Sequence, residues 1–173
     1  GLKMACGENP KRVYGGKGQA PATRMGNVAG YRASWIDAVD YRDKLAAAED
    51  GDGEAPKRDL KLETLVGVLD GEILVHNHCY RADEMSIMLD LAKEFGYKVT
   101  AFHHAVEAYK IADLLAEADT CAAVWADWWG FKMEAYDGIR ENAAIVDLAN
   151  ACAIIHSDDS IGIQMLNQET AKV

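Results

Sequence analysis

Residues 72–80 read EILVHNHCY and residues 98–105 read KVTAFHHA, and each is a short apolar run that ends in polar residues including histidine. Two later runs have the same form, TCAAVWADWW at 120–129 and CAIIHSDD at 152–159. Near-continuous apolar runs of this length are typical of strands that are covered on both faces. They predict four strands of one parallel sheet.

Segments with helical spacing follow each of these runs. The segment 82–95 repeats apolar side chains every three or four residues, and Gly96 stands where a helix would end. The segments 107–119, 140–150 and 162–172 follow the other three runs. Alternation of strand and helix predicts a parallel sheet with crossover helices. An open doubly wound sheet and a (β/α)8 barrel both fit this pattern.

The first seventy residues are less regular. Residues 1–6 form an apolar run that indicates a fifth strand, and residues 7–25 form a basic loop rich in Gly and Pro. Residues 26–70 show helical spacing in two stretches and are interpreted as a helical insert. We therefore expect a single domain over 1–173, with the first strand at one edge of the sheet and four βα units over 71–173.

Composition and charge restrict the function. The 28 acidic and 18 basic residues give a net charge of −10, which argues against a general nucleic-acid binder. No apolar stretch approaches the roughly 20 residues of a membrane span. No secretory signal is visible, and the chain opens at Gly1 without a Met, so we expect a preceding segment and infer nothing about localisation.

The four cysteines are far apart in the sequence. Cys6, Cys79, Cys121 and Cys152 form no CxxC pair, so a zinc knuckle or a thioredoxin motif is unsupported. Three of them adjoin predicted strands, and we interpret them as small buried thiols.

All five histidines lie at the ends of predicted strands. His76 and His78 end one run, His103 and His104 end the next, and His156 precedes Ser157, Asp158 and Asp159. The carboxyl ends of parallel strands converge on the functional face of α/β folds. A single histidine on a strand is more often structural, but imidazoles and a carboxylate that converge there predict a divalent-metal site.

Two other features have weaker implications. The tryptophans Trp125, Trp128 and Trp129 follow the third run and could line a substrate pocket or pack beneath their own loop. The segment YGGKGQ at 14–19 lacks the GK[ST] ending of a P-loop, so a flexible loop over the strand-end face is the better interpretation.

Several stretches together resemble the imidazolonepropionase-like and prolidase-like branch of the metal-dependent amidohydrolase superfamily. They occur in the right order over nearly the whole chain: GLKMACGENPKRVYG, VHNHCYRADEM, AFHHAVEAYKIAD, WADWWGFKMEAYDGI and IHSDDSIGIQMLNQE. The resemblance implies a partial (β/α)8 barrel that covers about strands four to eight. The HxH pair of strand one and strands one to three have no counterpart here.

The resemblance also implies a metal centre of one or two divalent ions, usually zinc. It points to His78, His104 and Asp158 as metal ligands and to Lys3 as a bridging ligand, with Glu8 as the rival candidate. Asp158 would also act as the general base, and His156 would support the oxyanion or the metal's surroundings. We expect His76 and His103 to be supporting or core groups, with His76 the more credible substitute ligand.

The implied reaction is hydrolysis of an amide or peptide C–N bond by metal-activated water. Dipeptides, N-acyl amino acids and cyclic amides are the candidate substrates, in a pocket formed by Tyr80, Arg81, Trp125, Trp128 and Trp129. Two alternatives stay open: a non-catalytic α/β module, and a half-barrel that is inactive alone and either forms homo-oligomers or pairs with a missing N-terminal half.

Overall fold

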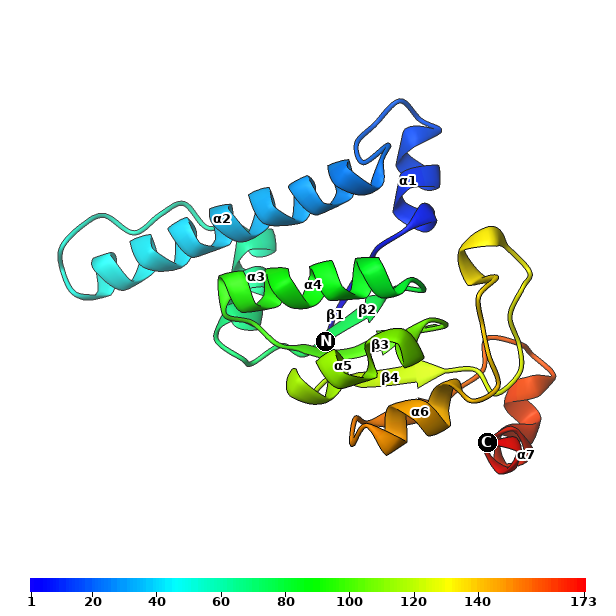
Figure 1. The fold of residues 1–173 in the computed structure, drawn as a ribbon. Coiled ribbons are helices and arrows are strands. Elements are labelled where there is room, and N and C mark those ends of the chain that lie inside the picture. Colours follow the sequence, from blue (N-terminus) through cyan, green and yellow to red (C-terminus); the bar gives the residue numbers. More distant parts are fainter.

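A five-stranded parallel sheet organises the chain. The computed structural model describes residues 1–173. The strands pair in sequence order, each parallel to the next, with β1 and β5 at the two edges (Figure 1). Their bounds are β1 Leu2–Ala5, β2 Val75–His78, β3 Val99–His103, β4 Cys121–Val124 and β5 Ala153–Ile155. The predicted α/β sheet, with the N-terminal strand at one edge, is confirmed.

Helices follow every strand. After β1 come three helices, α1 Glu8–Gly15, α2 Arg24–Glu49 and α3 Leu60–Leu69. Between the later strands lie α4 Ala82–Phe95, the 3₁₀ turn η1 Ala108–Ile111 with α5 Ala112–Glu117, and the turn η2 Met133–Ala135 with α6 Asn142–Leu148. The chain ends with η3 Gly162–Met165 and α7 Leu166–Lys172. Gly96 follows α4 in the left-handed conformation, as its position in the sequence predicts.

The two faces of the sheet have different surroundings. Val75, Phe102 and Val124 are almost fully buried and belong to one apolar cluster with Trp35, Met88 and other residues of the covering helices. The strand register places His76, His103 and Ile154 on the opposite face. His76 and His103 are half-buried and Ile154 is 41% exposed, so this second face is open.

Two expectations from the sequence need correction. Residues 8–15 form α1 and not a loop, because helical turns tolerate Pro10 near their start, where its missing N–H has no partner to lose. Cys6 pairs with Cys79 and Cys121 with Cys152, because strand pairing brings each distant pair together. The four are therefore not free thiols, and Cys152 is exposed.

The edge of β1 is partly covered by α2. The Tyr31 hydroxyl donates to the Ala5 carbonyl and accepts from the Ala5 N–H at 2.9 Å, while Asn27 Nδ2 donates to the same carbonyl at 3.0 Å. These contacts satisfy backbone groups that would otherwise be open to another strand. None of the helices has the length and apolar character needed to cross a membrane.

A buried ionic group holds the loop 125–141 to the start of the chain. Glu134 is 5% exposed, accepts from Arg24 Nη2 at 2.8 Å and from the Glu8 N–H at 2.9 Å. Arg24 Nε also lies 3.3 Å from Glu84 of α4. Figure 1 shows α1, this loop (yellow) and α7 at the end of the sheet toward which the strands point. The group therefore fixes loops over the carboxyl ends of the strands.

Gly7 should be the most sensitive glycine in this arrangement. It has φ +83°, and an added Cβ would overlap the Glu134 carboxylate. Gly71 is a matched control, with φ +78° and open space around its Cα. We expect Gly71→Ala to cost about 1 kcal/mol of unfolding free energy from backbone strain, and Gly7→Ala to cost roughly 1–3 kcal/mol more. Equal losses for the two variants in urea unfolding would contradict the close packing at Gly7.

Candidate metal centre

Five histidines form a continuous array on and beyond the open face of the sheet. His76 Nδ1 and His103 Nε2 lie 2.9 Å apart, so one ring donates a hydrogen bond to the other. The His104 ring lies 4.7 Å from the His78 ring and 5.0 Å from the His156 ring, between centroids. Three strands thus contribute imidazoles to one place, as parallel pairing requires.

His104 reaches this place through an unusual backbone conformation. It directly follows β3 and has φ +59°, in the left-handed region that non-glycine residues adopt infrequently. In a regular strand, His103 and His104 would point to opposite faces. The left-handed turn ends that alternation, so both rings lie near His156, with centroids at 6.2 and 5.0 Å.

The tightest group of donors consists of His104, His156 and Asp158. One ligand-competent atom from each lies within 4.8 Å of the others, and His104 Nδ1 is 2.8 Å from Asp158 Oδ2. His104 Nδ1 and His156 Nε2 are both buried, and neither makes a well-aligned hydrogen bond, His104 Nδ1 despite its closeness to the Asp158 carboxylate. Two orphaned imidazole nitrogens beside a carboxylate are destabilising on their own, and a divalent cation would satisfy all three. This donor set could therefore hold a metal.

His78 stands beside this group rather than within it. Its ring contacts His104 edge-on, and its Nε2 lies 3.0 Å from Asn9 Nδ2 at the start of α1. Of the three predicted ligands, the structure brings His104 and Asp158 together directly and places His78 adjacent to them. The sequence predicts a supporting role for His156. The structure instead places His156 in the donor group with His104 and Asp158.

Burial keeps these imidazoles neutral. It lowers the pKa of His104 to about 2 and the pKa of His78 to about 4, with a smaller contribution from neighbouring positive charges. Burial also lowers the pKa of His103 and of His156. A neutral ring keeps one nitrogen lone pair, which is the form that binds metals.

The two candidates for a bridging ligand have different surroundings. Lys3 is exposed and in register with His76 on the open face, and its charge contributes to the lowered pKa of His78 and His104, after burial. Glu8 begins α1, and its Oε1 lies 3.7 Å from Lys132 Nζ. Lys3 and Glu8 therefore both stay candidates for a bridging ligand.

Aromatic side chains line one side of the histidine group. Trp125 is buried and stacks against the His104 ring at 5.3 Å, and Tyr80 lies 5.9 Å from Trp125. Trp128 contacts Trp125 at 4.8 Å and stacks on Phe131 at 4.7 Å, and both are substantially exposed. These rings form a wall that leads from the site to solvent.

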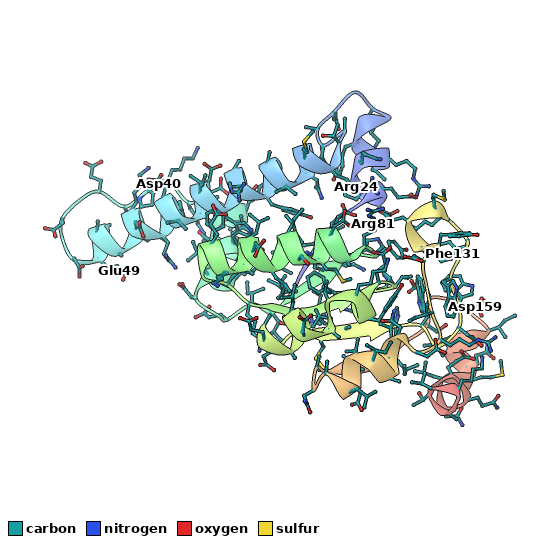
Figure 2. The ribbon with its side chains drawn as sticks, viewed as in Figure 1. Arg24, Asp40, Glu49, Arg81, Phe131 and Asp159 are labelled. Carbon is teal, nitrogen blue, oxygen red and sulfur yellow. A yellow bond between two sulfur atoms is a disulfide. The ribbon has the colours of Figure 1, made fainter.

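The other two predicted pocket residues have local partners. Trp129 lies against Gly138 of its own loop, and Arg81 binds Asp83 at the start of α4. Figure 2 shows Arg24, Arg81 and Phe131 near the same end of the molecule, with Asp159 close to α7. Asp40 and Glu49 lie toward the other end of the molecule, on α2. The wall thus consists of Tyr80, Trp125, Trp128 and Phe131.

Sequence reasoning missed the residues that support the site from the loops. Asn9, Lys132 and Glu134 come from segments that carry no histidine and no strand pattern. Lys132 Nζ lies 4.1 Å from the Tyr80 ring centre and 3.4 Å from Asn9 Oδ1. The only signal for Asn9 and Glu134 was their presence in stretches that carry the family resemblance.

Comparison with known proteins gives two relatives. The chain is 35% identical over 151 residues to the amidohydrolase tasK of Hapsidospora irregularis. This alignment covers 79% of this chain and 15% of that protein. A crystal structure of an amidohydrolase from Thermotoga maritima MSB8 matches with a TM-score of 0.88 and 34% identity, over 99% of this chain and 44% of that one. No protein-family model matches the chain.

These likenesses support an amidohydrolase family and confirm the fold prediction. Five parallel strands in sequence order, matched over 44% of a solved amidohydrolase, agree with a partial (β/α)8 barrel. The chain spans less than half the length of either relative. Neither name distinguishes the imidazolonepropionase-like and prolidase-like branch from others.

The buried rings should make the metal-free protein sensitive to acid. In the unfolded chain His78 takes up a proton near its ordinary pKa of 6.5, whereas in the folded chain it does so only near pH about 4. Protons therefore favour the unfolded state, and the stability that is complete above pH 6.5 is lost as the pH falls toward 4. We expect His78 alone to account for roughly 3 kcal/mol of this loss between pH 7 and pH 4.

Carboxylates also titrate in this range, so the comparison requires a variant. In His78→Phe, the free energy of unfolding should fall less steeply with acid than in the wild type, as measured by urea unfolding at several pH values. Parallel pH profiles for the two proteins would show that His78 is not held neutral.

Proposed function

We propose that this chain carries part of the metal site of an amidohydrolase of the imidazolonepropionase-like and prolidase-like branch, which hydrolyses an amide or peptide C–N bond. The observation that carries the proposal is the pair of buried, unpartnered nitrogens of His104 and His156 beside Asp158. The likeness to two amidohydrolases supports the same reaction class.

Five side chains are the proposed surroundings of one or two divalent ions, most simply zinc. Imidazole nitrogens and a carboxylate are a ligand set that suits zinc. His104, His156 and Asp158 would hold the first ion, with His78 completing the set from β2 and Lys3 as the bridging candidate. Bound there, the metal would lower the pKa of water and polarise the scissile carbonyl.

The proton transfers then fall to Asp158. Its side chain is 44% exposed, so it reaches both the histidine group and solvent. Asp158 takes the proton of the attacking water as the C–O bond forms, and delivers it to the leaving nitrogen as the C–N bond breaks. If His156 is not a ligand of the ion, it would instead stabilise the oxygen of the tetrahedral intermediate.

The wall of Tyr80, Trp125, Trp128 and Phe131 would bind the apolar part of the substrate. Stacked rings beside the reacting bond displace water and provide a flat apolar contact. Dipeptides, N-acyl amino acids and cyclic amides can all carry an apolar group next to an amide bond.

The 173-residue chain on its own should be a poor catalyst. It matches less than half of a solved amidohydrolase, its sheet has an open face, and both edge strands pair on one side only. Precise substrate positioning and water exclusion each affect rates by orders of magnitude. We propose that either a second copy of this chain or a separate half-barrel encloses the site.

Zinc binding should depend on the donor group and not on histidine content in general. We expect His104→Ala or Asp158→Ala to weaken zinc affinity at least about 100-fold, because each removes a direct ligand. His76→Leu is the matched control, since its ring pairs with His103 outside the group. Competition with a chromophoric chelator measures all three. Unchanged affinity in His104→Ala and Asp158→Ala would show that the ion binds elsewhere, and an equal loss in His76→Leu would show that the effect is not specific to the donor group.

Hydrolysis should be slow but metal-dependent. With zinc, the chain should cleave at least one member of a panel of dipeptides, N-acyl amino acids and cyclic amides at well below about 1 s⁻¹, the low end of typical enzymes. Asp158→Asn should remove this cleavage, because the amide cannot accept the proton. Mass spectrometry after long incubation detects the products, and turnover of about 1 s⁻¹ or above by the monomeric chain would contradict the need for a second half of the barrel.

A further inference from the structure

Asp158 lies just beyond the part of β5 that strand pairing holds. β5 is an edge strand of three residues, and its last bond to β4 is donated by the His156 N–H to the Val124 carbonyl at 3.1 Å. Asp158 follows two residues later. Its side chain is 44% exposed and makes one close polar contact, between Oδ2 and His104 Nδ1 at 2.8 Å. The direction of this carboxylate therefore depends on the backbone that follows β5.

Two side chains close a turn around Asp158. Ser157 Oγ accepts from the Asp159 N–H at 3.1 Å, so the residues on either side of Asp158 are bonded to each other. The Asp159 carboxylate in turn accepts through Oδ2 from the Ile161 N–H at 3.0 Å and from the Gly162 N–H. Side-chain oxygens of this kind satisfy backbone donors where strand pairing has ended. These bonds therefore fix the backbone that carries Asp158.

The turn is compact and is also tied at its far end. A Cβ at Gly162 would lie 2.9 Å from Ser157 Oγ and 3.3 Å from Asp159 Oδ2, so a side chain fits there only if the turn shifts. The helical turn η3 and α7 follow directly. Lys172 of α7 donates to Asp127 Oδ2 of the loop 125–141 at 3.0 Å. The turn thus has little freedom to move relative to the donor group.

Resting on the metal-dependent function proposed above, we propose that Asp159 is a positioning residue for Asp158. The two adjacent carboxylates have separate roles in this assignment. Asp158 faces His104 within the donor group, whereas Asp159 binds backbone N–H groups and lies outside that group. Asp159 touches neither the ion nor the substrate. Its effect is to hold the backbone that directs Asp158 toward the histidines.

The two roles need different chemistry, which makes them separable. Asp159 has to accept hydrogen bonds but needs no charge, and an asparagine oxygen accepts the same backbone bonds. An alanine accepts none, so the N–H groups of Ile161 and Gly162 would lose their partner. At Asp158 the charge itself matters, because an anionic oxygen attracts a divalent ion more strongly than an amide oxygen does. Asparagine should therefore be tolerated at 159 and harmful at 158.

The experiment compares four variants of the 173-residue chain by zinc competition with a chromophoric chelator. Asp159→Ala removes the acceptor, Asp159→Asn keeps it, and Asp158→Asn removes the charge of the ligand. Asp59→Ala is the matched control, because Asp59 Oδ1 accepts from the Lys61 N–H at 2.8 Å and the Leu62 N–H at 3.2 Å in the same way. It does so at the start of α3, which contributes nothing to the donor group. Thermal unfolding checks that every variant is folded at the temperature of the titration.

The assignment predicts a specific order of affinities. Asp159→Ala should bind zinc about 10–100-fold more weakly than the wild type, the usual loss when a group that orients a ligand is removed. Asp159→Asn and Asp59→Ala should match the wild type, whereas Asp158→Asn should bind more weakly. Unchanged affinity in Asp159→Ala, or an equal loss in Asp59→Ala, would overturn the positioning role. A loss in Asp159→Asn as large as that in Asp158→Asn would also overturn it, because Asp159 would then act through its charge.

Spectra of the metal-free protein separate this inference from the proposed function. The ¹H–¹³C signals of the His104 ring depend on the nearby Asp158 carboxylate, and Asp158→Ala gives their position without it. Asp159→Ala should move the His104 signals toward that position, and Asp159→Asn should leave them unchanged. If the wild type bound no zinc, the metal-dependent function would fail, but the spectra would still decide the role of Asp159. Wild-type His104 signals in Asp159→Ala would overturn that role in either case.

Discussion

In a parallel sheet the carboxyl ends of all strands lie at the same end of the sheet, and this constraint creates the histidine array. β2, β3 and β5 each end in or beside histidine, and parallel pairing in this order brings His78, His104 and His156 together. The opposite face is sealed by helices through Val75, Phe102 and Val124. Removal of one strand from the sheet would therefore disperse the site as well as open the core.

Regular strand geometry alone would not direct both His103 and His104 to the site, because adjacent residues on a strand point in opposite directions. His103 stays in register on the open face and pairs with His76. His104 leaves the strand in the left-handed region, at an energetic cost that folded proteins usually accept only where surrounding contacts enforce it. Stacking against Trp125 and the approach of Asp158 are those contacts here.

The strands and the helices between them could be predicted from the sequence because each depends on local periodicity, whereas the strand order of a barrel was implied only by the family resemblance. The histidines could be assigned to the carboxyl end of the sheet for the same reason. The helix over residues 8–15 could not, since Gly7, Pro10 and Gly15 suggest a loop, and the contact that fixes its start comes from Glu134, more than a hundred residues away. The closeness of His156 to Asp158 depends on the turn after β5, which periodicity does not describe.

Charge as well as apolar packing orders the loops around the site. Arg24, Glu84, Glu134 and Lys132 come from two helices and a loop, and both glutamates are largely buried. Removal of one partner from such a group leaves an uncompensated buried charge, which costs several kcal/mol. Burial indeed raises the pKa of Glu84, although Arg24 opposes this effect. The ionic group therefore couples α1, α2, α4 and the loop 125–141, which carries the rings over the site.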